Sequence, residues 1–145
     1  MLWLQRLLIA GAMLAPLSVT AQTPESRVAE SWEKAVIYLP GELKPTPRGE
    51  IKLDKPTPVA LFMHGCAGIG KDDHAWARLL AEKGLLVVMP DSLARTDRQP
   101  SCDPAKLKGG LFPPAAAMRL EEISYATGQI RKQSWFDGKN LFLMG

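Results

Sequence analysis

Three short hydrophobic runs, at residues 59–63, 85–89 and 140–144, dominate the pattern of the chain after residue 58. Each has the length of a strand and shows no alternation of apolar and polar side chains, so we expect strands buried on both faces. Such strands are typical of parallel sheets that helices cover on both sides. Residues 35–39 predict a further short strand, which Pro40 and Gly41 end.

Two segments between these strands have helical patterns. Asp72 or Asp73 can cap a helix that runs to about Lys83, with Gly84 at its C′ position. Its inward face is expected to carry Trp76, Leu79 and Leu80. Residues 119–136 predict a second helix, whose inward residues are expected to be Leu120, Ile123 and Ile130. The alternation of strands and helices predicts an α/β fold with a parallel sheet.

The remaining segments have little periodicity. Residues 22–32 are polar and are expected to form a loose leader. Residues 42–58 contain four prolines, which confine a second strand at 50–53 to a sheet edge. Residues 92–118 form a long irregular excursion, and so long a loop in a compact domain is usually functional or pinned.

The first 21 residues have the features of a secretory signal peptide. Arg6 is followed by an apolar run over 7–19, and Val19, Thr20 and Ala21 provide the small residues of a cleavage site. The run is too short for a membrane span, although an uncleaved anchor is the alternative. We therefore expect a periplasmic or secreted protein with a leader at 22–32 and a domain at 33–145.

Composition fits one globular domain, and neither a nucleic acid nor a membrane is expected as a partner. The chain has 145 residues, of which 46% are hydrophobic and 23% are charged. The formal net charge of +3 is spread along the chain, so no basic stripe predicts nucleic-acid binding. After signal cleavage we also expect no membrane partner.

The only cysteines are Cys66 and Cys102. A lone pair in an oxidising compartment is usually a disulfide, and export therefore predicts a bond between them. Together with His64 and His74 they offer zinc-binding residue types, but the spacing matches no recurrent zinc pattern. We expect no metal ion and no other cofactor.

A glycine-rich turn, HGCAG at residues 64–68, follows the first buried strand. In acyl-transfer enzymes an N–H of this strand-to-helix loop forms half of the oxyanion hole. The alternative is a tight turn that needs glycine only for its backbone angles. The segment from Gly65 to Lys71 also approaches a phosphate loop, but Asp72 stands where Ser or Thr must bind magnesium.

Four stretches carry a resemblance to a known family: VALFMHGCAGIG (59–70), WARLLAEKGLLVVMPDSLAR (76–95), PSCDP (100–104) and FDGKNLFLMG (136–145). In this order they resemble the α/β-hydrolase family, and within it the dienelactone-hydrolase-like group of exported proteins. The resemblance implies the N-terminal half of a doubly wound α/β-hydrolase sheet, incomplete at the C-terminus. It also implies hydrolysis of a carboxylic ester or a similar acyl bond.

The family's triad runs in the order nucleophile, acid, histidine. The turn after His64 corresponds to its oxyanion-hole loop, which makes the backbone N–H of Cys66 or Ala67 the candidate donor. Gly145 corresponds to the first glycine of the nucleophile elbow G-x-S-x-G. The nucleophile, acid and base are then expected beyond Gly145, and this chain alone is expected to be inactive. No G-x-S-x-G frame surrounds any of Ser31, Ser92, Ser101, Ser124 and Ser134.

The resemblance also assigns smaller roles. Enzymes with dienelactone activity carry an acidic residue near the oxyanion loop, and HGCAG has none, so the expected substrate is a generic small acyl ester. His64 is expected to order the turn, and His74 to lie on the first turn of an exposed helix. The Cys66–Cys102 bond would pin residues 92–118 over the site. The alternative function is a non-catalytic exported binding module that uses the glycine-rich loop.

Overall fold

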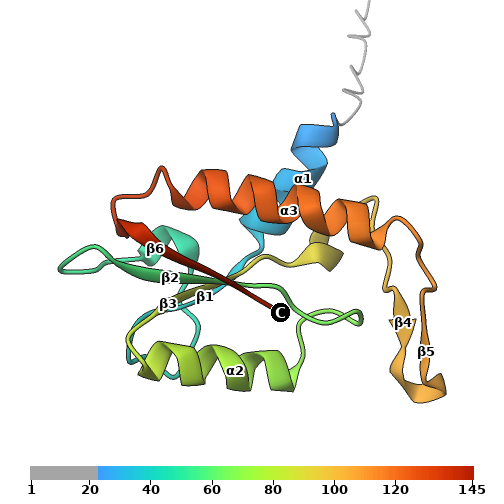
Figure 1. Ribbon diagram of the computed structural model, residues 1–145, viewed down its shortest axis with the longest axis horizontal. Helices are drawn as coiled ribbons and strands as arrows, with labels where there is room; N and C mark the ends of the chain where they lie inside the picture. Colours follow the sequence, from blue (N-terminus) through green and yellow to red (C-terminus); the bar gives the residue numbers. More distant parts are fainter. Residues whose placement is uncertain (1–22) are drawn as a thin grey trace, which may run out of the picture.

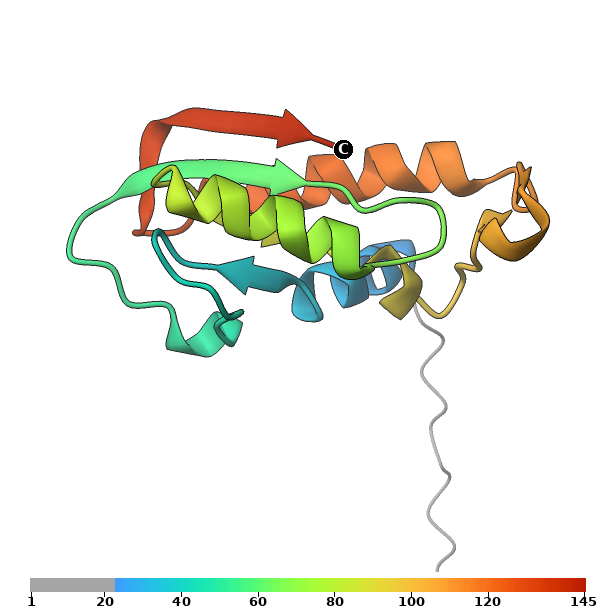
Figure 2. The ribbon, with the colours of Figure 1, turned by 90° about the horizontal axis from the view of Figure 1, so that it is seen from below.

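The computed structural model describes residues 23–145, so the signal peptide predicted at 1–21 lies outside the described residues. Their centre is a four-stranded sheet with helices on both faces (Figures 1 and 2). The elements follow in the order α1 (Pro24–Glu33), β1 (Val36–Tyr38), η1 (Arg48–Glu50), β2 (Thr57–Phe62), α2 (Lys71–Glu82), β3 (Leu86–Met89), η2 (Ser92–Ala94), β4 (Cys102–Asp103), η3 (Pro104–Lys106), β5 (Lys108–Gly109), α3 (Ala115–Ile130) and β6 (Phe136–Met144).

The sheet order is β1-β3-β2-β6, and β2 pairs in parallel with both β3 and β6. The predicted α/β class is therefore confirmed. The expectation of a parallel sheet is only partly right, because β1 runs antiparallel to β3, with Val36 opposite Met89. An antiparallel edge strand on an otherwise parallel sheet is common, and antiparallel pairing does not require a crossover helix.

Both central strands are buried on both faces, as their apolar runs predict. Val59 and Leu61 of β2 face α1 and α3, whereas Ala60 and Phe62 face α2. In Figure 1, α1 and α3 lie above the sheet and α2 lies below it. The sheet thus separates two hydrophobic clusters, one for each layer of helices.

The expected loose leader at 22–32 is wrong, because residues 24–32 belong to α1. The Thr23 side chain caps the helix by accepting a hydrogen bond from the Ser26 N–H, and Pro24 occupies its first turn. Val28 and Trp32 are buried beneath it. Packing of these two side chains stabilises the helix, although most residues of the segment are polar.

Helix α2 begins at Lys71, before Asp72 and Asp73, the two residues that were expected to cap it. Gly70 is the N-cap, and the Asp73 carboxylate accepts a hydrogen bond from the Gly70 N–H at 2.7 Å. The expected inward face is also wrong: the two fully buried residues are Ala77 and Ala81, and Trp76 is 54% exposed. Small side chains let the helix lie close to the sheet. Leu79 is also exposed, and Leu80 is partly buried against the sheet.

Helix α3 spans 115–130 rather than 119–136. Its buried row repeats every four residues and consists of Met118, Glu122, Ala126 and Ile130. Ile130 is buried as predicted, but Leu120 is 69% exposed and the carboxylate of Glu122 takes an inward place. A charged residue in the buried row needs partners, and these are described with the site.

The segment 92–118 is irregular, as expected, and contains a small hairpin of β4 and β5 that extends beyond the carboxyl ends of the central strands (Figures 1 and 2). The strand expected at 50–53 is absent from the described residues, where η1 and an extended segment follow the prolines.

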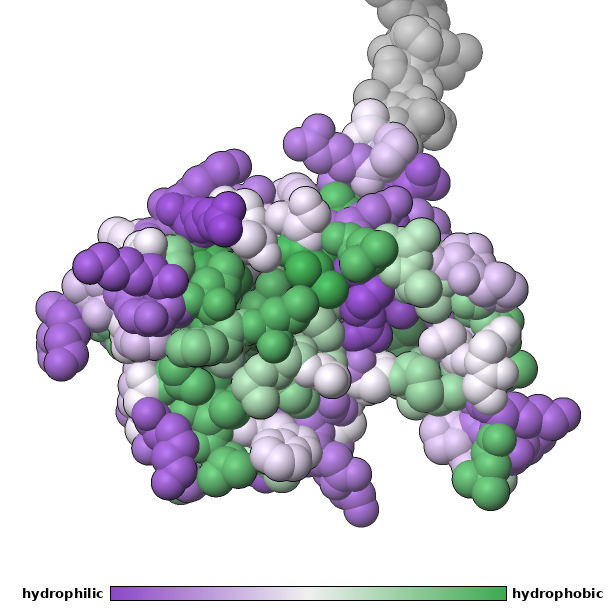
Figure 3. All heavy atoms as spheres, in the orientation of Figure 1, coloured by the Kyte–Doolittle hydropathy of each residue, from purple (hydrophilic) through white to green (hydrophobic). Residues whose placement is uncertain are grey.

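Strand β6 is longer than predicted and lies at the edge of the described sheet. It is not buried on both faces: Phe142 and Leu143 are exposed on opposite sides. Figure 3 shows the resulting hydrophobic band across β6 and α3. Among residues 23–145, no helix is both long enough and apolar enough to cross a membrane.

Candidate active site

A pocket of about 500 Å³ lies where the parallel strands β2 and β6 end, beside the first half of α3. The chain leaves β2 toward α2 on one face and enters β6 from α3 on the other. In open α/β sheets, ligands bind at such a reversal, outside the carboxyl ends of the strands. The pocket is lined by Met63, His64, Arg119, Ile123, Leu143, Met144 and Gly145.

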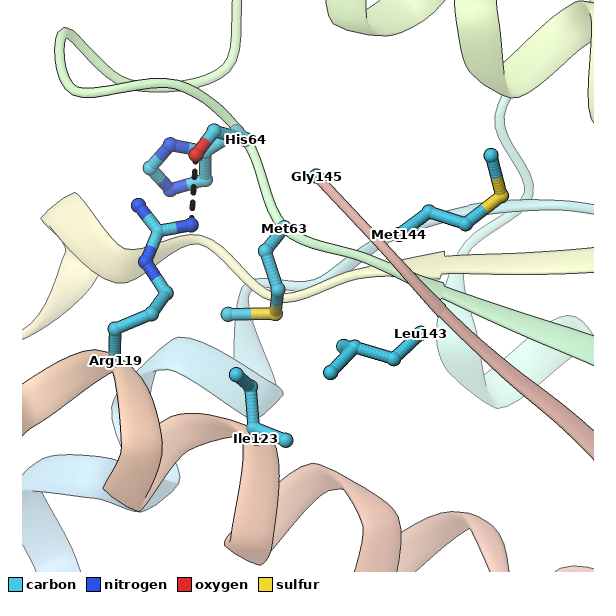
Figure 4. Close-up of a pocket in the computed structure, with 7 residues that line it drawn as sticks. All are labelled: Met63, His64, Arg119, Ile123, Leu143, Met144 and Gly145. Carbon is cyan, nitrogen blue, oxygen red and sulfur yellow. Dashed lines mark hydrogen bonds between the residues drawn. The ribbon is translucent and has the colours of Figure 1, made fainter. Parts of the chain in front are cut away.

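The lining is apolar on its floor and polar on one side. In Figure 4 the side chains of Met63, Leu143 and Ile123 point toward one another, while Arg119 reaches His64. The Arg119 guanidinium donates a hydrogen bond to the His64 carbonyl oxygen at 2.7 Å. Burial, and next the nearby charge of Arg98, lowers the pKa of Arg119 from its ordinary value. A hollow of this kind fits a mostly apolar molecule with one polar end.

A second hollow of about 500 Å³ opens on the α2 side of the same strand ends. It shares Met63, His64, Met144 and Gly145 with the first pocket, and Asp72, Asp73 and Trp76 form its outer wall. In Figure 4 the Met144 side chain points to this side of β6, away from Ile123. The end of β6 therefore lies between two hollows.

The turn predicted as an oxyanion loop follows β2 and begins at His64, which lines both hollows. Cys66 and Ala67 are exposed at its tip. Within the described residues, neither of their backbone N–H groups donates a hydrogen bond. Neither residue lines either hollow, but both follow directly after His64, which lines both, and Gly65, which lines the second. Unpaired N–H groups close to a pocket are what an oxyanion site requires. Their assignment as oxyanion donors stays a prediction.

Glycine is needed at Gly68 for two reasons. Its φ of +100° is in the region that side-chain-bearing residues avoid, and an added Cβ would lie 2.8 Å from Cδ1 of Leu93. The Gly68 N–H donates to the Gly65 carbonyl oxygen at 3.3 Å, which closes the turn. Glycine therefore serves the turn and its contact with η2, as the alternative interpretation of HGCAG proposed, and the two exposed N–H groups remain free as well.

The predicted disulfide between Cys66 and Cys102 is confirmed, with a Cα–Cα distance of 5.5 Å. The Ser101 N–H also donates to the Cys66 carbonyl oxygen at 3.0 Å, so the hairpin is fastened to the turn twice. Because both thiols are consumed, the zinc set of two histidines and two cysteines is wrong. Residues 23–145 contain no cluster of three or more histidine, cysteine or acidic side chains that could hold a metal ion.

The phosphate-loop alternative also meets a charge conflict. The carboxylate of Asp73 already accepts the N–H of Gly70 at the start of α2, and Asp72 lies beside it. A phosphate at this helix end would face two negative side chains. The start of α2 is therefore not an anion site.

His64 is 2% exposed and contacts the turn, as expected. Burial lowers its pKa, and the charge of Arg119 lowers it further, although the Gly65 carbonyl, Asp91 and Asp73 act in the opposite direction. His74 is only partly exposed, and its Nδ1 forms a hydrogen bond with the buried Tyr38 hydroxyl at 2.9 Å. Neither histidine presents a free ring nitrogen to the pocket.

A buried ionic cluster lies between α3 and the segment after β3, and sequence reasoning missed it. The side chain of Glu122 is fully buried. Its carboxylate accepts hydrogen bonds from Arg98 at 3.1 Å and Arg95 at 3.5 Å. Its second oxygen accepts from the Ser92 hydroxyl. Only the clustering of arginines around 95–98 hinted at it, because one glutamate in a helix gives no signal of burial.

Gly145 occupies the position that the resemblance assigns to the start of the elbow. An added Cβ would lie 2.7 Å from the Met63 carbonyl oxygen, so a close approach between β6 and β2 requires glycine here. The Met63 N–H donates to the Met144 carbonyl oxygen at 2.8 Å, which continues the ladder to this point. The structure thus brings Gly145 next to the turn at 64–68.

Comparisons with known proteins add no family assignment. No protein-family model matches the chain, and a search of curated proteins finds no match.

Proposed function

We propose that this domain supplies the oxyanion donors and the pocket floor of an exported acyl hydrolase of the α/β-hydrolase type. The observation that carries the proposal is the pair of N–H groups at Cys66 and Ala67 that donate no hydrogen bond, in the turn that follows the pocket residue His64 at the end of β2. Gly145, packed against Met63, supports it as the first residue of the elbow.

The proposed reaction uses a nucleophile on the segment that follows Gly145. Its hydroxyl or thiolate attacks an ester carbonyl, and the negative charge that develops on oxygen is stabilised by the N–H groups of the turn. The base, also proposed on the segment after Gly145, takes the proton of the attacking group and gives it to the alcohol that collapse expels. The same base then removes a proton from the water that releases the acid from the acyl-enzyme. The apolar floor formed by Met63, Ile123 and Leu143 would hold the acyl or alcohol group.

The contacts of His64 and Ser92 argue against a role for either residue as the general base or the nucleophile. Both ring nitrogens of His64 are engaged, so it cannot act as the general base. Ser92 is fully buried, and its hydroxyl is held by Glu122, so it is no nucleophile. We therefore expect no ester hydrolysis from the 145 residues alone.

The disulfide and the signal-peptide features of residues 1–21 support a periplasmic or secreted location. The substrate is proposed to be a small carboxylic ester, because the turn carries no acidic residue of the kind expected for dienelactone cleavage.

The first test is the coding sequence beyond codon 145. We expect one residue, then serine or cysteine, then a small residue and glycine. The extended protein should release nitrophenol from short-chain nitrophenyl esters in a burst, with an acyl adduct detectable by mass spectrometry, and the 145-residue chain should not. A stop codon with no such continuation would refute the enzyme and favour the non-catalytic binding module.

A further inference from the structure

The protonation of His64 follows from its two partners. Its Nδ1 lies 2.7 Å from the Gly65 carbonyl oxygen, which can only accept, so Nδ1 carries the proton. Its Nε2 lies 3.0 Å from the backbone nitrogen of Ser92, whose N–H can only donate, so Nε2 is unprotonated. The imidazole is therefore neutral and fixed in one tautomer.

The imidazole holds the peptide that bears the candidate oxyanion donor. The Gly65 carbonyl and the Cys66 N–H belong to one planar trans peptide, in which they point in opposite directions. Once the Gly65 oxygen is fixed by Nδ1 of His64, the direction of the Cys66 N–H is fixed as well. The Gly68 N–H assists by donating to the same oxygen.

Ser92 is in turn held from α3. Its hydroxyl donates to Glu122, whose other oxygen accepts from Arg98 and Arg95. Three residues earlier on the same helix, Arg119 donates to the His64 carbonyl oxygen at 2.7 Å. Helix α3 therefore acts on His64 in two ways. Arg119 binds its carbonyl oxygen directly, and Glu122 acts on its ring through Ser92.

This ionic cluster is costly as a purely structural device. Buried ion pairs can often be replaced by apolar residues without loss of stability. The cluster is also not fully satisfied, since the buried Nε of Arg98 has no hydrogen-bond partner among the described residues. A role in orienting a site accounts for such a network better than a role in stability does.

We infer that Glu122, Ser92 and His64 form a hydrogen-bond chain that orients the Gly65–Cys66 peptide, and with it the N–H that the proposed function assigns to the oxyanion hole. The inference rests on that proposed function for its catalytic meaning. His64 is then a positioning residue, and the proton on its Nδ1 stays in place throughout the reaction.

Two substitutions of His64 separate this role from a structural one. His64→Asn places an amide N–H near the Nδ1 position and leaves nothing at Nε2. His64→Gln places an amide oxygen near the Nε2 position and leaves no donor for Gly65. In NMR spectra of the ¹⁵N-labelled, oxidised 145-residue chain, we expect the Asn variant to keep the parent Cys66 amide shift and the Gln variant to move it. The reverse order would overturn the inference, because Ser92 would then be the contact that matters.

The contact between Ser92 and Glu122 is tested with Ser92→Ala. This variant removes the hydroxyl held by Glu122 but keeps the backbone N–H of residue 92. Long-range ¹H–¹⁵N spectra should show the single His64 tautomer of the parent chain become a mixture. Ser124→Ala, at an exposed site on α3, is the matched control and should change nothing. A single unchanged tautomer in Ser92→Ala would show that the Ser92 hydroxyl and Glu122 do not act on His64, and the hydrogen-bond chain would then begin at the backbone N–H of residue 92.

These spectra need no turnover, so they stand apart from the hydrolase proposal. If the extended protein is active, His64→Gln should lower kcat roughly ten- to hundred-fold more than His64→Asn does, with KM little changed. Equal losses in the two variants would refute the positioning role while the hydrolase proposal survives. Absence of any esterase activity would refute the hydrolase proposal and, with it, the catalytic meaning of the chain.

Discussion

Replacing both cysteines with serine, as C66S/C102S, should lower the free energy of unfolding by up to about 3.8 kcal/mol. The bond joins residues that are 36 apart in the sequence. Closing a loop of that length removes about 13 cal/mol/K of entropy from the unfolded chain, which is about 3.8 kcal/mol at 25 °C. Serine leaves no cavity at these sites, because Cys66 is exposed and Cys102 is half-buried.

The measured loss in the free energy of unfolding depends on how the native state responds to removal of the bond. Without the bond, the hairpin of β4 and β5 keeps the hydrogen bond from the Ser101 N–H to the Cys66 oxygen. If the hairpin becomes mobile in the variant, the native chain gains entropy and the loss is smaller. The calculated value is therefore an upper estimate.

Urea unfolding followed by tryptophan fluorescence and circular dichroism measures the effect. For an m-value of about 2 kcal/mol/M, the midpoint should fall by roughly 2 M. A phosphine reductant should shift the parent protein to the midpoint of the variant and leave the variant unchanged, which controls for effects of the substitutions themselves. Equal midpoints for the oxidised parent and the variant would refute the reasoning.

Three further predictions concern the site. Gly68→Ala should cost about 1–3 kcal/mol because of its positive φ and the contact with η2, whereas Gly65→Ala, with open space around its Cβ, should stay within about 0.5 kcal/mol in the same urea experiment. Glu122→Ala should cost about 3–5 kcal/mol because it leaves the buried Arg98 guanidinium without the carboxylate of Glu122 and removes one of the carboxylates around Arg95. Glu121→Ala removes an exposed carboxylate from Arg95, which keeps Asp97, and should cost less than about 1 kcal/mol; equal losses would contradict the burial of the cluster. Because burial holds the folded pKa of His64 below its ordinary value of 6.5, the unfolded chain gains a proton first as the pH falls. The free energy of unfolding should therefore fall as the pH drops from about 6.5 through the folded pKa, and His64→Asn should remove that slope.

Local sequence signals were sufficient for the central strands and for the disulfide. The runs at 59–63 and 85–89 are apolar at every position because helices cover both faces of the sheet, and a five-residue run of this kind is too short for a typical helix. The pairing of Cys66 and Cys102 needed only their number and the signal peptide as a clue to the compartment.

Side-chain burial within the helices was harder to predict, because tertiary contacts decide it. In α2 the larger Trp76 and Leu79 point outward and two alanines face the sheet, which reverses the usual preference for large apolar residues inside. In α3, Glu122 is buried because arginines from a distant segment meet it there. Neither outcome has a signature within the helix itself.

The helix at the start of the described residues illustrates a signal that was present but outweighed. Thr23 followed by Pro24 is a favourable helix start, yet the polar composition of 22–32 suggested a loose segment. The helix is stabilised because Val28 is buried and Trp32 joins the hydrophobic cluster on this face of the sheet.

The exposed edge of β6 has a consequence for handling the protein in concentrated solution. Asp137 and Lys139 place charges at the start of this strand, but its last four residues, 141–144, are all apolar, and Phe142 and Leu143 are exposed. Charged side chains on an edge strand discourage pairing between molecules, and this half of the strand has none. A lysine at position 143 would act as a gatekeeper there, and we expect it to lower the light scattering of concentrated solutions of the chain.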